Sequence, residues 1–362
     1  MEKKTGKTSV FIKAGGLICP HWRGRILAII GLLFLLMLVI IFGTSIGSAE
    51  IPFLKTTGIL ISKIPFIDIT PSWDNAAETI VVDIRLPRVI LAGLVGAALA
   101  LAGATYQGLF RNPLADPYLI GVAQGAALGA VLGFLSPVSK VGMGISLVPI
   151  LAFLGALLSV MIVYLLARVG RIVPVTTLIL AGVALGALLG AIVAYLAITS
   201  GQLLHGIMFW LSGSFSLTQW SEVIIVMPII AVGAIVILLF SRMLNIMQLG
   251  EEQAQQLGLN VEKFKIILLA AATMVTAAAV SFVGIIGFVG IITPHAVRLI
   301  WGPDYRFLLP LSLVCGSIFL IIADVVARTI IAPSEIPIGV ITALCGAPFF
   351  LYLLRRRAKM LF

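Results

Sequence analysis

Residues 85–130 read RLPRVILAGLVGAALALAGATYQGLFRNPLADPYLIGVAQGAALGA, and this stretch decides the fold class. After Arg85 and Arg88, which flank a proline, an apolar run continues to residue 110 without a charged side chain. The following RNPLADP contains two prolines, and each disfavours helix at the residue before it, so a sharp turn is predicted there. In the next apolar run, glycines recur at every fourth position from Gly121 to Gly133. Two apolar runs that are joined by a tight turn and carry a stripe of small residues predict closely packed membrane helices.

The rest of the chain has the same apolar character. Apolar residues make up 61% of the 362 residues and charged residues only 10%, and the mean hydropathy is +1.20. A soluble domain contains roughly 25% charged residues. We therefore predict an all-α membrane protein with about ten transmembrane helices. The ten apolar runs lie near residues 26–46, 89–110, 118–135, 146–167, 173–198, 223–241, 265–283, 284–300, 307–330 and 337–354.

The basic residues predict which side of the membrane each segment occupies. If the N-terminus is cytoplasmic, eighteen of the 24 Lys and Arg residues fall in cytoplasmic segments, as the positive-inside rule requires. The net charge of +10 then reflects topology, and it gives no reason to expect a nucleic-acid partner. The six basic residues in outer segments are Lys55, Lys63, Arg85, Arg88, Lys140 and Arg328.

This topology divides the chain into three parts. Residues 1–25 are a cytoplasmic tail, residues 26–354 a single ten-helix domain, and residues 355–362 a second cytoplasmic tail. Within the domain, residues 50–84 form the longest outer connection and residues 242–265 a cytoplasmic loop. We expect a multi-pass protein of the cytoplasmic membrane with both termini inside the cell.

The loop 242–265, RMLNIMQLGEEQAQQLGLNVEKFK, is a polar island between two apolar runs. Its glycines predict two short helices or one broken helix, with Gly258 at a helix C-terminus. Ala254, Leu257 and Leu259 form a small apolar face among glutamates and glutamines. A loop that only connects two spans has no use for such a face, whereas a loop that docks into a groove on another protein does.

On the outer side, the two arginines of RLPR have two possible roles. They can extend to lipid headgroups, or they can present a cationic pair to carboxylates of a partner. Further along, Asp324 precedes Arg328 by four residues, a spacing that predicts an ion pair on one helix.

No residues in the sequence form a catalytic or metal-binding pattern. The histidines, His21, His205 and His295, lie in three different regions, and we interpret His295 as an interior polar group. His205 and Gln202 belong to a polar outer segment, residues 199–222, that is long enough for a short helix at the mouth of a pathway. We therefore expect neither an enzyme nor a cofactor. An ion-coupled secondary transporter is the alternative of a different class, but the centres of the spans carry almost none of the ionisable residues that it needs.

At this point the chain resembles a known family. Residues 85–130 are similar to the permease subunits of ATP-binding-cassette importers for ferric siderophores, haem and cobalamin. The resemblance continues, in matching order and spacing, over nearly all of residues 85–354. The further motifs are LAGVALG (180–186), FWLSGSF (209–215), LGEEQAQQLGL (249–259), GFVGIITPHAVRLI (287–300), ADVVAR (323–328) and EIPIGVITALCGAPFF (335–350).

The resemblance implies a homodimer with a pathway along its twofold axis. It also implies two cytoplasmic ATPase subunits, which hydrolyse the ATP, and one extracytoplasmic binding protein. The cargo would be a ferric siderophore or haem, with cobalamin as the alternative. The outer loop 50–84 is longer than usual in the family, which leaves the docking surface there open.

Three sets of residues acquire roles from the resemblance. Docking of the binding protein falls on Arg85, Arg88 and Arg328. Coupling to the ATPase falls on Leu249, Gly250, Glu251, Glu252, Ala254, Leu257, Gly258 and Leu259. The pathway and its helix packing, roughly residues 174–210, include Gly182, Gly186, Gly190, Gln202 and His205.

Overall fold

The computed structural model describes residues 22–361 except residue 48, residues 65–72 and 139–145, and residue 171. Most of the expected N-terminal tail, Lys140 and Arg171 therefore lie outside the described residues. The described part consists of helices: α1 (Trp22–Ser45), α2 (Phe53–Ser62), α3 (Asn75–Thr79), α4 (Leu86–Leu109), α5 (Val122–Leu135), α6 (Leu147–Ala167), α7 (Val175–Thr199), α8 (Leu204–Leu211), α9 (Trp220–Leu239), α10 (Ser241–Met247), α11 (Glu251–Gln256), α12 (Val261–Val283), α13 (Val289–Trp301), α14 (Tyr305–Thr329) and α15 (Ile338–Leu361).

Each of the ten predicted runs corresponds to one helix. Among the described residues, seven continuous helices are long and apolar enough to cross a membrane, and α5, α13 and the apolar part of α15 are shorter. The irregular run 284–300 begins with an extended segment, and its helix starts only at Val289. At the C-terminus, residues 355–361 of the predicted tail are helical and continue α15.

The expected outer loop 50–84 is largely helical. It contains α2, α3 and a π-helical segment, Ile80–Arg85, that runs without a break into α4. Pro87 lacks an N–H and its ring crowds the preceding turn, and a wider π turn before it relieves that conflict. Trp73 packs over Gly58 and donates to Glu78, which also pairs with Lys63. Because the π-helical segment continues into α4, the second span starts well before the predicted residue 89.

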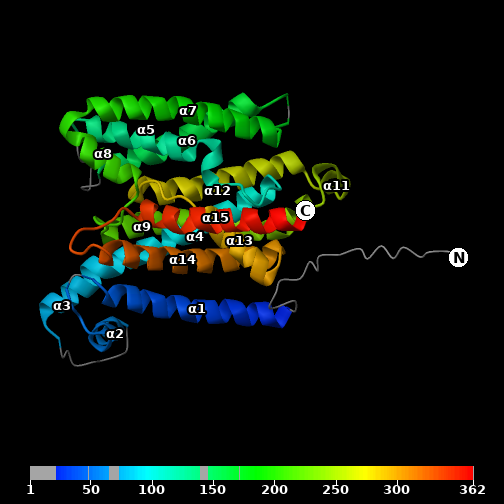
Figure 1. Cartoon of the computed structure of the whole chain (residues 1–362). Helices are drawn as coiled ribbons and strands as arrows, with labels where there is room; N and C mark the ends of the chain where they lie inside the picture. Colours follow the sequence, from blue (N-terminus) through cyan, green and yellow to red (C-terminus); the bar gives the residue numbers. More distant parts are fainter. Residues whose placement is uncertain (1–21, 48, 65–72, 139–145, 171, 362) are drawn as a thin grey trace.

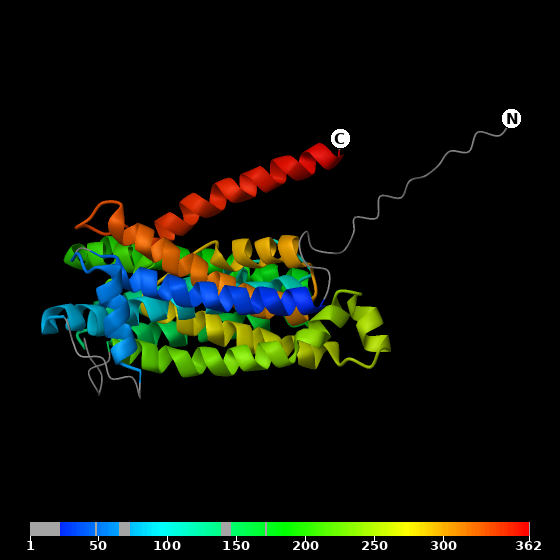
Figure 2. The same cartoon turned by 90° about the horizontal axis from the view of Figure 1, so that it is seen from below.

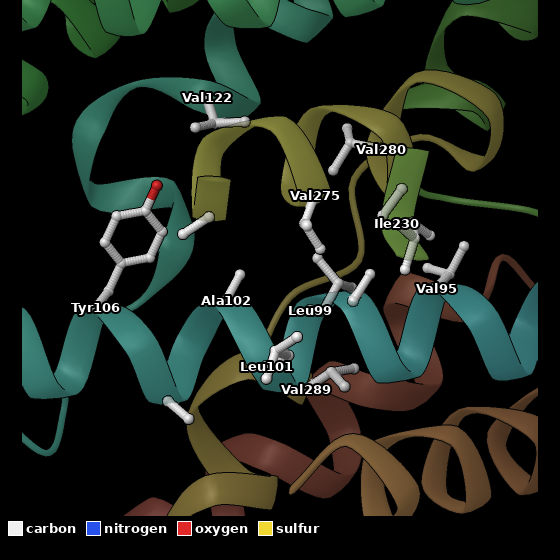
Figure 3. Close-up of a cluster of buried hydrophobic side chains, with 14 of the residues drawn as sticks. Val95, Leu99, Leu101, Ala102, Tyr106, Val122, Ile230, Val275, Val280 and Val289 are labelled. Carbon is white, nitrogen blue, oxygen red and sulfur yellow. The ribbon is translucent and has the colours of Figure 1, made fainter. Parts of the chain in front are cut away.

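The helix α4 lies at the centre of the bundle, and nearly all of its residues are buried. Figure 3 shows Val95 and Leu99 of α4 on the side of Ile230 in α9 and Val275 in α12, while Leu101 lies beside Val289 of α13. Small residues let these backbones approach closely. A Cβ added to Gly96 would overlap the carbonyl oxygen of Gly316 in α14, and one added to Gly103 would overlap that of Gly290 in α13.

The glycine stripe of α5 packs against α6, as the spacing predicts. A Cβ at Gly125 would collide with Gly155 of α6, and a Cβ at Gly129 with the backbone at Leu151. The helix α7 is different, because few of its residues are buried in the single chain. It forms one edge of the molecule, and α1 forms the opposite edge (Figure 1).

The two ends of the bundle differ. Figure 1 shows α11 projecting from the end where α1 begins and where the chain terminates, while α2, α3 and α8 lie at the other end. Figure 2 shows α15 leaving the bundle along its length. The polar loop 242–265 and the arginines of RLPR thus lie at opposite ends of the helices, as the charge distribution predicts.

Candidate functional site

The arginines Arg85, Arg88 and Arg328 line one cavity of about 120 Å³ at the end of the bundle that carries α2 and α3. Glu335 completes its polar wall. The long contact between α4 and α14 brings the start of one helix beside the end of the other, and this places the three arginines together. The three arginines to which the resemblance assigns docking therefore lie together in the fold.

Arg88 is the centre of an ion-pair network. Its Nε and Nη2 atoms donate to the carboxylate of Asp324 at 3.1 and 2.8 Å. Its Nη1 and Nη2 atoms donate to the carboxylate of Glu335 at 2.7 and 3.1 Å. Burial by itself raises the pKa of Glu335, but the hydrogen bonds and the charge of Arg88 hold that pKa below its ordinary value.

Arg85 points inward and not toward the solvent. It is 5% exposed and donates to the carbonyl oxygens of Thr44 and Ser45, at 3.3 and 2.8 Å, and of Ala49. Thr44 and Ser45 are the last residues of α1, where unsatisfied carbonyls and the helix dipole favour a cation. Arg85 therefore caps α1, and this geometry differs from the expected cationic pair that RLPR presents to a partner.

Arg328 is 8% exposed, and its Nε atom lies 3.5 Å from Asp324, which confirms the predicted pair on α14. A second nitrogen donates to the carbonyl of Gly43 in α1. Two features were not predicted from the sequence: the main partner of Asp324, which is Arg88, and the participation of Glu335. The available signal was charge balance, because buried arginines need counter-ions and both carboxylates lie in motifs adjacent to Arg328.

At the opposite end, the coupling loop forms the two short helices that its glycines predict, α10 and α11. Gly258 has a φ of +85°, its N–H donates to Gln255, and the N–H of Leu259 donates to Ala254. These two bonds are the pattern of a Schellman motif, so the predicted helix C-terminus is confirmed.

The apolar face of this loop divides into two parts. Ala254 is fully buried and Leu259 packs against the core, whereas Leu257 is 65% exposed and Leu249 is 57% exposed. Of the predicted face, Leu257 alone is exposed, and Leu249 of the same loop is a second exposed leucine. A single chain presents them on the segment that projects furthest from this end of the bundle (Figure 1).

Polar contacts hold the loop to the helices above it. Asn245 of α10 donates to Asp304 at 2.7 Å and accepts from the N–H of Tyr305 at 2.9 Å, at the start of α14. Gln248 donates to the carbonyl of Gly108 near the end of α4. Burial by itself raises the pKa of Asp304, but bonds from Arg306 and Asn245 hold it at about 2. Sequence reasoning did not find these residues, since an isolated Asn or Gln gives no signal of its partner.

A second set of contacts joins α11 to α12 and to the connection after α6. Lys265 lies 2.7 Å from Glu251 and 3.2 Å from Glu262, and Glu262 accepts from the N–H of Val173. Two glutamates begin α11. Glu251 forms an ion pair within the chain, whereas Glu252 is exposed. Polar contacts thus join the loop 242–265 to the ends of α4, α12 and α14.

The residues predicted to line a pathway lie on α7 and at its outer end. Gly182 packs against the carbonyl of Leu119, and Gly186 and Gly190 face the side chain of Gln124. Gln202 and His205 are exposed on the single chain. A further cavity of about 490 Å³ opens between α8, the segment before α13, and α15, and its lining is Leu211, Ser212, Ile285, Gly287, Phe288, Gly339, Val340, Ala343 and Leu344.

Comparison with known proteins shows which family the chain matches. The sequence model of the FecCD transport family matches residues 34–356. A cobalamin import system permease protein of Halobacterium salinarum is 50% identical over 283 residues, which cover 78% of this chain and 75% of that protein. A hemin transport system permease protein of Yersinia pestis is 40% identical over 346 residues, 93% of this chain and 98% of that protein.

A solved structure has the same fold. A metal-chelate type ABC transporter in an inward-facing conformation superposes with a TM-score of 0.77 at 30% identity, over 91% of this chain and 99% of that one. The alternative of an ion-coupled transporter has no support in these relatives. The chain belongs to the FecCD transport family, and it is a multi-pass membrane permease subunit of an ATP-binding-cassette importer, with ATP hydrolysis on a separate subunit.

Proposed function

We propose that this permease imports an iron chelate, a ferric siderophore or haem, and that cobalamin is the second candidate cargo. The observation that carries the proposal is the cavity of about 490 Å³, whose lining is neutral and mostly apolar. Such a surface lets a bulky chelate pass without holding it tightly. The relatives named for hemin and cobalamin transport support these two cargo classes.

We infer that two copies of the chain form the transporter. The cavity is open on the single chain, and apolar side chains remain exposed around it, among them Val340, at 42%, and Leu344, at 66%. Much of α7 is also uncovered. A homodimer that closes around this cavity buries both surfaces and gives the pathway a second wall.

We further propose that the arginine cavity faces the cell exterior and receives the binding protein, while Leu249 and Leu257 meet the ATPase subunits in the cytoplasm. Both termini then lie in the cytoplasm. The distribution of basic residues supports this orientation. ATP-driven movement of the two coupling loops would rock the bundles between outward-open and inward-open states.

The cargo is tested on the substrate-binding protein of this system. Ferric siderophores, haem and cobalamin are titrated separately while quenching of its intrinsic fluorescence is followed. We expect saturable quenching by one iron chelate or by haem. Tight binding of cobalamin alone would replace the first proposal by the second, and binding of none of the three would refute both.

A further inference from the structure

Both edges of the Arg88 guanidinium that can hold a carboxylate are occupied within the chain. The edge of Nε and Nη2 holds Asp324, and the edge of Nη1 and Nη2 holds Glu335. Each pair has the two-point geometry that makes arginine–carboxylate contacts strong. A carboxylate that arrives from outside therefore finds no free edge on Arg88.

The two internal partners differ in how easily they can leave. The Asp324 side chain is 2% exposed, and it also pairs with Arg328, so its departure leaves buried Arg328 without its ion-pair partner and Arg88 with Glu335 alone. The Glu335 side chain is 29% exposed and lies on the connection between α14 and α15. When it leaves Arg88, water can solvate its carboxylate. Glu335 is thus the exchangeable counter-ion.

Glu335 also contacts a segment beside the 490 Å³ cavity, which is the proposed mouth of the pathway. The hydroxyl of Ser216, in the connection between α8 and α9, donates to Glu335 at 3.0 Å. Beside this contact, the N–H groups of Ile338 and Gly339 donate to the carbonyls of Gly213 and Ser212 at 2.9 and 3.0 Å. Ser212 and Gly339 line the 490 Å³ cavity. One carboxylate therefore joins the docking arginine to the outer edge of that cavity.

We propose that Glu335 occupies the place of an acidic side chain of the binding protein and is displaced when that protein docks. The inference rests on the proposed docking role of the arginine cavity. A second carboxylate in this cavity repels Glu335, and the two compete for one edge of Arg88. Displacement breaks the contact with Ser216, so docking loosens the joint between α15 and the segment after α8. Arrival of the binding protein is thereby linked to movement at the mouth.

The exchange is tested with Glu335→Gln in the permease dimer in lipid nanodiscs, by titrating the substrate-binding protein of the system. We expect about fivefold tighter docking, because loss of a part-exposed ion pair of ~1 kcal/mol removes a competitor of that strength. The matched control is Glu78→Gln, which removes one negative charge from a glutamate that is paired with Lys63 in the same outer segment as Arg85. Its docking should equal that of the wild type. Unchanged or weaker docking of Glu335→Gln overturns the exchange.

A second variant separates this inference from the docking role itself. Arg88→Lys keeps a positive charge beside Asp324 but cannot form the two-point contacts of a guanidinium with carboxylates. We therefore expect weaker docking of the binding protein. If Arg88→Lys docks like the wild type, the docking role of Arg88 fails. If Arg88→Lys weakens docking while Glu335→Gln does not tighten it, the docking role stands and only the exchange fails.

The link to the mouth has its own measurement. Ser216→Ala removes the hydroxyl that Glu335 holds and leaves Arg88 untouched. We expect it to raise ATP hydrolysis of the assembled transporter in the absence of binding protein, but without tighter docking. Hydrolysis at the wild-type rate in Ser216→Ala would refute the link.

Discussion

At the scale of single residues, Asp324 decides how three arginines coexist in a membrane protein. It accepts from Arg88 through both oxygens and lies 3.5 Å from Arg328, and its side chain is 2% exposed. Charges in such an environment are tolerated only when they are paired. Arg85 is stabilised differently, because it donates hydrogen bonds to backbone carbonyls at the end of α1. The cluster is therefore both a candidate docking site and a structural joint between α1, α4 and α14.

This joint makes a prediction about stability. Asp324→Asn keeps the size of the side chain but leaves two buried arginines without their shared counter-ion. We expect a loss of about 3–5 kcal/mol in the free energy of unfolding, which is the cost of breaking a buried pair. The measurement is the thermal unfolding midpoint of the protein in detergent. Asp74→Asn is the control, because Asp74 pairs with Lys55 on the surface, and its midpoint should not move. Equal midpoints for the two variants would contradict the structural role of Asp324.

At the scale of elements, α10 and α11 form a small unit that is fixed on one side and exposed on the other. Asn245 and Gln248 hold it to α14 and α4, and Lys265 holds it to α12. Leu249 and Leu257 point away from the bundle as exposed apolar side chains. In the proposed coupling role, a contact on the exposed face would reach the spans through these polar contacts.

The exposed face predicts a selective defect. Leu257→Asp should abolish or strongly weaken binding of the ATPase subunits, because it places a charge in an apolar contact, while the permease itself remains folded. The measurement is co-purification of the ATPase subunits and ATP-dependent uptake into proteoliposomes. Leu54→Asp is the matched control, since Leu54 is 83% exposed on α2 at the opposite end of the bundle. If both variants retain the ATPase subunits, the coupling assignment is wrong.

At the scale of the whole molecule, α4 and α14 connect the two ends. The helix α14 begins beside Asn245 at the coupling loop and ends with Arg328 in the arginine cavity. Along its length it packs on α4, where Gly96 and Gly316 bring the two backbones into contact. This closely packed helix pair therefore connects the loop 242–265 with the arginine cavity.

Close packing here predicts low tolerance to added volume. Gly96→Val should prevent assembly of a stable permease, because even its Cβ overlaps the Gly316 carbonyl oxygen. The control is Gly31→Val in α1, where an added Cβ meets no atom within 4 Å. The measurement is the yield of monodisperse protein after detergent extraction. Normal yield of Gly96→Val would show that α4 and α14 can separate without loss of the fold.

Several features of this protein were determined by its sequence alone. The ten apolar helical runs, the opposite ends of the loop 242–265 and the arginines, and the helix end at Gly258 all follow from apolar length, charge distribution and local turn chemistry. These properties belong to short stretches of chain, so they can be read without knowing which helices touch. The pair of Asp324 and Arg328 is local in the same sense, since both residues lie one turn apart on α14.

Only the tertiary structure decided how these parts are joined. Arg88 is separated in the sequence by 236 positions from Asp324 and by 247 from Glu335, yet it contacts both. Asn245 and Asp304, which also form a hydrogen bond, are 59 positions apart. The inward turn of Arg85 and the burial of Ala254 beside the exposed Leu257 also depend on neighbours that are distant in sequence. The physical reason is that such contacts are set by which helix faces pack together, and that choice depends on steric fit over the whole bundle.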